Sequence, residues 1–122
     1  LRSVSSNIRD FNHDYWTGTV YTTNRRVWEY DEEFKNYLRK IRVMAVDMET
    51  ATLFTCGFAN HISTGALLLV SDQPMISEGV KTDKSDKIVT ENFAAQHVLI
   101  GIKSLTTLIN NGSTVKHLRF DW

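Results

Sequence analysis

The stretch Val43-Met44-Ala45-Val46-Asp47-Met48-Glu49-Thr50-Ala51 decides the fold of this chain. It opens with an apolar run, ends in two carboxylates that flank a methionine, and continues into a segment with helical spacing. An apolar run of this length that ends at a change of polarity is typical of a buried strand. We therefore predict a strand at residues 43–48 and a helix at about 50–60. Asp47 and Glu49 then lie near the carboxyl end of the strand, where open α/β sheets bind ligands.

A second apolar run, Ala66-Leu67-Leu68-Leu69-Val70, stops at Ser71-Asp72-Gln73-Pro74. A strand that is buried on both faces has this composition, so we predict a strand at residues 64–71. If the two strands are parallel, Glu49 and Asp72 converge at one rim of the sheet. The alternative is that each carboxylate caps whatever follows its strand.

The rest of the chain continues the alternation of helical and strand-like segments. Such alternation favours the α/β class, with a mainly parallel sheet and flanking helices. The few strands make a poor sheet by themselves, so we expect residues 1–122 to be a single partial domain, the carboxyl-terminal half of a larger one. Before the strand at 43–48, we predict a helix within 1–15 and a strand at 16–22. A helix capped by Asp31 follows, with Phe34, Leu38 and Ile41 as its apolar stripe. After the strand at 64–71, we predict a polar loop from 73 to about 83, a helix over 85–109 closed by Gly112, and a last strand at 115–120.

Composition limits the kinds of partner. The 14 basic and 14 acidic side chains give a formal net charge of zero, which argues against binding to nucleic acid or to a membrane surface through charge. No apolar run reaches the roughly 18 residues of a membrane span. The single cysteine, Cys56, excludes an internal disulfide and fits a reducing, cytoplasmic compartment.

Cys56 falls on the predicted helix at 50–60, where Leu53, Phe54, Gly57 and Phe58 share one face. We expect this helix to be buried and Cys56 to be a small core residue. The four histidines, at positions 13, 61, 97 and 117, do not have metal-ligand spacing. We therefore expect neither a metal ion nor a cofactor.

Two features near the strand at 16–22 could bind a ligand. Arg25 and Arg26 follow this strand and could hold a phosphate or a carboxylate by charge-assisted hydrogen bonds, or could form a solvated turn. Trp28 could stack on a planar ligand, or could simply pack against its neighbours.

The segments Val46-Asp47-Met48-Glu49-Thr50-Ala51 and Val70-Ser71-Asp72 resemble two motifs of the purine nucleoside phosphorylase and nucleosidase superfamily, a strand-to-helix Met-Glu-x-Ala and a Ser-Asp about twenty residues later. Within that superfamily, the segments Thr17-Gly18-Thr19-Val20-Tyr21-Thr22-Thr23-Asn24, Trp28-Glu29 and Ser71-Asp72-Gln73-Pro74 are similar to the AMP nucleosidase family. The resemblance covers almost the whole chain.

The resemblance implies a fold, a reaction and site residues. The fold would be the carboxyl-terminal part of a nucleoside phosphorylase-like mixed sheet flanked by helices. The reaction would be hydrolysis of AMP to adenine and ribose 5-phosphate by a cytoplasmic homo-oligomer. Glu49 matches the glutamate that binds the ribose hydroxyls, Met48 the methionine that packs against the sugar, and Asp72 the acid that helps to protonate N7 of the purine.

The same resemblance places the segment from Arg26 to Trp28 over the base, with Trp28 as the best aromatic candidate. Asp47 and Ser71, which adjoin the matched residues, complete the predicted substrate-binding set. The alternatives are a nucleoside phosphorylase or another purine nucleosidase of the superfamily, and a non-catalytic association module. We also expect the loop at 73–85 to close over the base when substrate binds.

Overall fold

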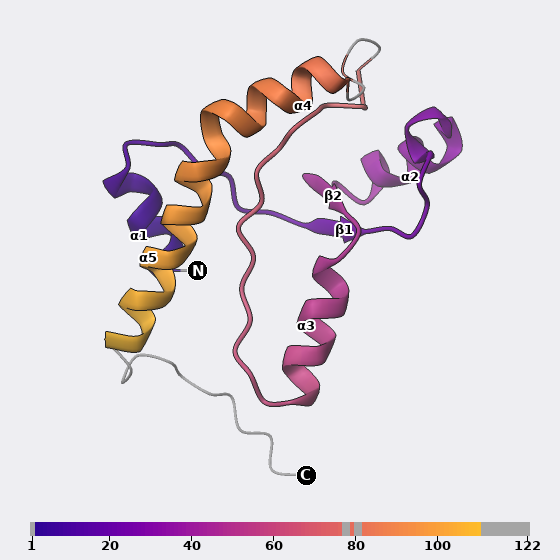
Figure 1. Cartoon of the computed structure of the whole chain (residues 1–122). Helices are drawn as coiled ribbons and strands as arrows, with labels where there is room; N and C mark the ends of the chain where they lie inside the picture. Colours follow the sequence, from indigo (N-terminus) through magenta and orange to yellow (C-terminus); the bar gives the residue numbers. More distant parts are fainter. Residues whose placement is uncertain (1, 77–78, 80–81, 111–122) are drawn as a thin grey trace.

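The computed structural model describes residues 2–76, 79 and 82–110, which form two groups of elements (Figure 1). In one group, helix α1 (Arg2–Asp10) lies along helix α5 (Ala95–Asn110). In the other, strands β1 (Val20–Thr22) and β2 (Ala45–Asp47) lie with helices α2 (Glu32–Lys40) and α3 (Thr50–Ala59). After α3 the chain is extended over residues 62–73 and passes between the two groups, and helix α4 (Asp83–Val89) lies further along the chain.

β1 and β2 pair in parallel, with Val20 opposite Ala45 and Thr22 opposite Asp47. Beyond the pairing, the amide of Thr23 donates to the carbonyl oxygen of Asp47 at 2.8 Å. Both strands are shorter than the predicted strands at 16–22 and 43–48. The parallel sheet with surrounding helices confirms the α/β class, and it brings the carboxyl ends of both strands to one edge.

Helix α2 forms where the sequence predicts it, because its cap and its apolar stripe are both local. The Asp31 carboxylate accepts a hydrogen bond from the Phe34 amide at 2.9 Å. Phe34 and Leu38 are buried, whereas Ile41 lies just past the helix and is exposed. On the sheet side, the Tyr21 ring packs edge-on against Phe34, with 5.6 Å between ring centroids. This aromatic contact joins α2 to β1.

The predicted long helix at 85–109 is also confirmed. It begins at Asp83 after a capping box in which the Thr82 hydroxyl accepts from the Ser85 amide at 3.2 Å. It runs through a π-helical turn, Thr90–Ala94, into α5. Ile100 on α5 and Ile8 on α1 are buried where the two helices lie together. Gly112 and the predicted strand at 115–120 lie outside the described residues.

The predicted strand at 64–71 is not formed. The chain is extended there, but no described residue pairs with it in a sheet. Leu67 is half-buried, but Leu69 is 38 % exposed and Val70 is 58 % exposed, so neither face of the run is fully covered. A strand needs a neighbour to accept and donate its backbone hydrogen bonds, and an apolar strand also needs a layer on each face. The described residues supply neither.

The prediction that the helix at 50–60 is buried is also wrong. The helix is present as α3, but Leu53, Phe54, Phe58 and the thiol-bearing Cys56 are exposed, so Cys56 is not a core residue. Gly57 is the buried residue of α3. A Cβ atom at Gly57 would overlap the methyl group of Thr64, so glycine lets the chain after α3 return closely against it.

Candidate active site

A compact hydrogen-bond network occupies the point where β2 turns into α3. The Thr22 hydroxyl donates to Asp47 Oδ1 at 2.7 Å, and the Thr50 amide donates to Asp47 Oδ2 at 2.7 Å. The Thr50 hydroxyl also donates to Asp47 Oδ2. On the other side, the Ala51 amide donates to the Thr22 hydroxyl oxygen at 2.9 Å. Thr22 and Asp47 therefore satisfy two of the backbone N–H groups that the first turn of a helix leaves without intrahelical partners.

Asp47 is held as an anion by this network. Its partial burial acts to raise its pKa, but the hydrogen bonds from the Thr50 side chain, the Thr22 hydroxyl and the Thr50 and Glu49 backbone outweigh that effect. The pKa of the Asp47 carboxyl consequently lies below its ordinary value. Hydrogen bonds that are made to the charged form have this effect.

Glu49 has a different environment from Asp47. It occupies the N-cap position of α3, but its side chain makes no capping hydrogen bond. Its Oε2 accepts from the Met48 amide at 3.3 Å, and both Met48 and Glu49 are exposed. The two carboxylates therefore differ in their contacts. Asp47 caps the helix, and Glu49 lies on the surface at the end of the sheet.

Ser71 and Asp72 form a local pair. The Ser71 hydroxyl donates to Asp72 Oδ1 at 2.6 Å, and both residues are half-buried. Within the described part of the chain, no hydrogen bond or ion pair joins Asp72 to Glu49. The two acids are not brought together by strand pairing, because the segment that ends at Asp72 is not paired with β2.

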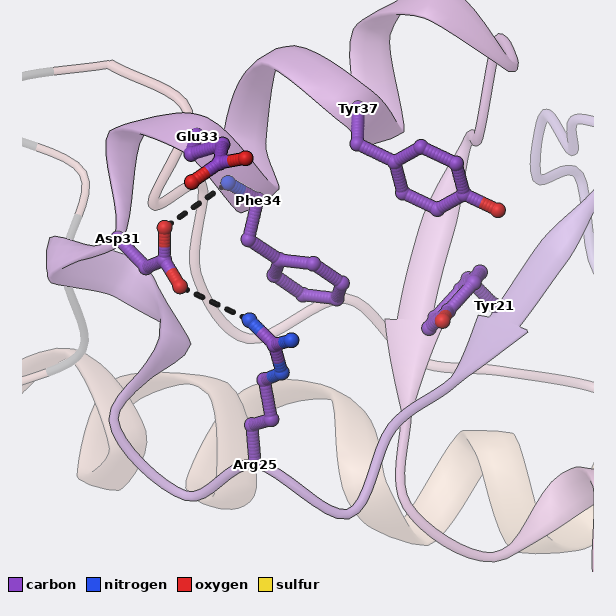
Figure 2. Close-up of a pocket in the computed structure, with 6 residues that line it drawn as sticks. All are labelled: Tyr21, Arg25, Asp31, Glu33, Phe34 and Tyr37. Atoms are coloured by element: carbon purple, nitrogen blue, oxygen red, sulfur yellow. Dashed lines mark hydrogen bonds and ion pairs between the residues drawn. The ribbon is translucent and has the colours of Figure 1, made fainter.

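An open cavity of about 320 Å³ lies between β1 and α2, on the side of the Tyr21 ring (Figure 2). Arg25 reaches into it, with Nη1 at 2.9 Å from Asp31 Oδ2 and its guanidinium carbon 4.7 Å from the centre of the Phe34 ring. The acid that caps α2 thus also holds Arg25. The cavity is lined by Tyr21, Arg25, Asp31, Glu33, Phe34 and Tyr37.

Arg26 and Trp28 lie next to this cavity in the chain. Arg26 is exposed on the turn after Arg25. The Trp28 ring packs edge-on against Phe34, with 6.1 Å between centroids. Both adjacent arginines are exposed, but Arg25 is held by the Asp31 carboxylate and the Phe34 ring.

Sequence reasoning missed Thr22 and Thr50 as members of the network. An acidic residue three positions before a threonine at a helix start is a recognisable capping pattern, so Asp47 with Thr50 could have been found. Thr22 could not, because it meets Asp47 only through the register of two strands that lie 25 positions apart.

Among the described residues, no group of three or more His, Cys, Asp or Glu side chains is arranged to hold a metal ion. None of the described helices combines the length and the apolar character needed to cross a bilayer. The loop at 73–85 includes residues 77–78 and 80–81, which lie outside the described residues, so its closure over a ligand stays a prediction.

The chain belongs to the phosphorylase superfamily, whose family model matches residues 1–105. The parallel strands with an acidic strand-to-helix turn are thus those of a nucleoside phosphorylase-like α/β fold. The chain is 50 % identical to a crystal structure of AMP nucleosidase from Bacteroides thetaiotaomicron VPI-5482, with a TM-score of 0.71. That match covers 93 % of this chain and 41 % of the solved chain.

Curated relatives point to the same group. AMP nucleosidase of Escherichia coli strain K12 is 35 % identical over 98 residues, which is 79 % of this chain and 20 % of the relative. The protein of the same name from Escherichia coli O157:H7 matches equally. This chain therefore spans about a fifth of the length of these relatives and about two fifths of the solved one.

Proposed function

We propose that the protein containing this chain hydrolyses the N-glycosidic bond of AMP to give adenine and ribose 5-phosphate. The observation that carries the proposal is the 50 % identity over 93 % of this chain to an AMP nucleosidase of known structure. The exposed Met48-Glu49 pair at the end of β2 and the Ser71-Asp72 pair supply the chemical groups that the reaction needs.

Glu49 and Met48 are proposed to hold the sugar. A carboxylate can accept hydrogen bonds from two hydroxyl groups, and Glu49 has this capacity because it does not cap α3. As the bond from C1′ to the base breaks, positive charge builds on the ribose. A fixed carboxylate nearby stabilises that charge more in the transition state than in the ground state. Met48, half-exposed beside it, offers an apolar surface to the sugar ring.

Asp72 is proposed as the general acid. When the glycosidic bond breaks, its electron pair goes to the purine, and a proton delivered to N7 makes the purine a better leaving group. Water adds its hydroxyl to C1′ and its proton is released. General-acid catalysis of this kind is worth about 10²–10⁴-fold in rate. The Ser71 hydroxyl donates to Oδ1 at 2.6 Å, which orients the carboxyl group and leaves Oδ2 for the base.

Trp28 and Arg26 are proposed to complete the base side of the site. Trp28 packs in a T-shaped arrangement with Phe34, and its half-exposed ring keeps a surface that can lie along a purine. Arg26 is exposed on the turn before Trp28, and its guanidinium can donate hydrogen bonds to the acceptor nitrogens of the purine. Asp47 supports the site through its hydrogen bonds to Thr22 and Thr50 at the start of α3.

This chain is further proposed to be the carboxyl-terminal half of the catalytic domain, within a cytoplasmic homo-oligomer. Its share of the relatives' length and the uncovered apolar run at 66–70 support the half-domain proposal. The residues that bind the phosphate of the nucleotide and orient the water would then come from the other half.

The test is to incubate the intact protein with AMP and with adenosine, each with and without inorganic phosphate, and to identify the sugar product. Release of ribose 5-phosphate from AMP without a phosphate requirement supports the proposal. Ribose 1-phosphate formed from adenosine only when phosphate is added would make the protein a nucleoside phosphorylase instead. If neither substrate is cleaved while the protein still assembles, the chain is an association module.

A further inference from the structure

We propose that Thr22 and Asp47 are positioning residues that cap α3 in place of Glu49 and so leave the Glu49 carboxylate available to the ribose hydroxyls. The proposal deepens the proposed function and rests on the role given there to Glu49. Neither Thr22 nor Asp47 needs to touch the substrate for this role.

Glu49 lies at the N-cap of α3 without capping it. A residue at the N-cap usually turns its own side chain inward to accept from the N–H group two or three positions later. Glu49 sits at this position and does not do so. Of the N–H groups in the first turn of α3, the first two already have acceptors other than Glu49. The Thr50 amide is bound by Asp47 and the Ala51 amide is bound by Thr22.

Thr22 acts at this site through its hydroxyl group. Its hydroxyl donates to Asp47 Oδ1 and at the same time accepts from the Ala51 amide. A hydroxyl group can do both, whereas a methyl group of the same size can do neither. Thr22 is thereby the link between the end of β1 and the first turn of α3. It reaches that place because the parallel register sets Thr22 opposite Asp47.

Removing the Thr22 hydroxyl would change the surroundings of Glu49. Without the Thr22 hydroxyl, the Ala51 amide loses its acceptor. Glu49, two positions earlier in the sequence, has a carboxylate that does not already cap α3. A helix N-terminus attracts such an anion. Glu49 would then turn toward the helix and lose its hold on the ribose. We therefore expect the variant to lose its preference for AMP over substrates that lack a ribose hydroxyl. A loss of stability alone would lower the activity toward all of these substrates equally.

The experiment compares Thr22→Val, which is isosteric, with Thr22→Ser, which restores the hydroxyl, in the intact protein. The matched control is Thr55→Val, since the Thr55 hydroxyl also bonds to the backbone of α3, at the Ala51 carbonyl oxygen, but lies outside the cap. For each variant, kcat/KM is measured with AMP, 2′-deoxy-AMP and 3′-deoxy-AMP. The measured quantity is the ratio of kcat/KM for AMP to kcat/KM for one deoxynucleotide. The deoxynucleotide chosen is the one that the wild type cleaves less efficiently.

The wild type should prefer AMP by about 10- to 100-fold, the range for one hydrogen bond to a charged group. We expect Thr22→Val to lower this preference by about tenfold or more, and Thr22→Ser and Thr55→Val to keep it within about threefold. In a Glu49→Gln background, Thr22→Val should change the preference no further, because it acts through Glu49. Asp47→Asn is the second variant if Thr22→Val does not fold, and it should lower the preference in the same way.

The outcomes separate the two proposals. If the wild type cleaves AMP with this preference and Thr22→Val and Asp47→Asn both keep it, the positioning role is overturned and the proposed function stands. If Thr22→Val and Thr55→Val lower kcat/KM equally for all three substrates, the effect is only structural and the positioning role is again overturned. If the wild type cleaves no nucleotide or does not discriminate among the three, the role of Glu49 is wrong and the positioning role falls with it.

Discussion

Asp47 and Glu49 stand two positions apart and have opposite surroundings. Asp47 accepts hydrogen bonds from two threonine hydroxyls and a backbone amide, while Glu49 is exposed and makes no capping bond. The alternation of side chains along a strand puts both on one face in extended chain, so spacing alone treats them alike. The difference arises because Thr22 reaches only one of them.

At the residue scale, we predict that Asp47→Asn destabilises the protein and changes its response to acid. An amide nitrogen cannot accept from the Thr50 or Thr22 donors, and a buried donor without an acceptor costs about 1–3 kcal/mol. Because the pKa of Asp47 is lowered in the folded state, its charge contributes stability above the ordinary carboxyl pKa of about 4. That contribution disappears as the pH falls through the lowered pKa.

Thermal unfolding of the intact protein between pH 7 and pH 3 measures this prediction. The wild type should lose its advantage over Asp47→Asn as the pH falls below about 4. Asp14→Asn, an exposed carboxylate outside the network, is the control. A constant difference in Tm between wild type and Asp47→Asn over the whole range would contradict the capping role.

We predict that Asp72→Asn and Glu49→Gln, made in the intact protein, impair hydrolysis differently. Asp72→Asn cannot transfer a proton, so kcat should fall by about 10²–10⁴-fold while the binding of AMP changes little. Glu49→Gln weakens contacts to hydroxyls that are present before the bond breaks, so it should affect KM as well as kcat. A substrate with a better leaving group should rescue Asp72→Asn far more than Glu49→Gln. Equal rescue of both would show that the acid is wrongly assigned.

At the scale of elements, the helices follow the sequence closely and the strands do not. Asp31 caps α2 and Thr82 caps α4, as short-range signals indicate. A helix satisfies its backbone hydrogen bonds within the segment, so local residues decide it. The apolar run at 66–70 has the composition of a strand and remains unpaired, because a strand depends on a neighbour that lies elsewhere in the chain.

For α2, we predict that Asp31→Ala costs about 0.5–2 kcal/mol of stability, the usual loss for a helix cap, and that Asp31→Asn costs much less. Asparagine keeps the acceptor for the Phe34 amide and loses the charge that pairs with Arg25. That pair is largely exposed, so its loss should matter little. Denaturant unfolding of both variants measures the difference, and equal losses would mean that the ion pair, and not the cap, holds this end of α2.

At the scale of the whole molecule, apolar side chains are exposed on α3 and along residues 66–70. The α1–α5 pair and the β1–β2–α2 group each have a small buried centre, around Ile8 and Ile100 in one and Phe34 and Leu38 in the other. Neither buried centre covers the apolar run at 66–70. A run that is apolar on both faces is stable in water only when other layers cover it.

We predict that the backbone amides of residues 66–70 exchange slowly with solvent in the intact protein and quickly in isolated residues 1–122. Pairing in a sheet protects amides, whereas an extended unpaired segment leaves them open. Hydrogen exchange followed by mass spectrometry compares the two samples, with the amides of α2 as an internal reference for folding. Fast exchange of 66–70 in both would contradict the proposal that this run is a strand of a larger domain.

We also predict that isolated residues 1–122 do not hydrolyse AMP at a useful rate, because the groups that bind the phosphate and orient the water are proposed to lie in the other half of the domain. Adenine release by the purified chain is the measurement, with the intact protein as the positive control. Robust turnover by the isolated chain would overturn the half-site proposal.

The sequence by itself determined the α/β class, the helix capped by Asp31, the helices predicted at about 50–60 and at 85–109, and the family motifs around Glu49 and Asp72. Capping residues, helical periodicity and short motifs are local properties of the chain. Only the tertiary structure decided that Asp47 caps α3 while Glu49 does not, and that the apolar run at 66–70 is unpaired in these residues. Both depend on which segments lie side by side. The register that sets Thr22 opposite Asp47 joins residues 25 positions apart, and no local signal carries that information.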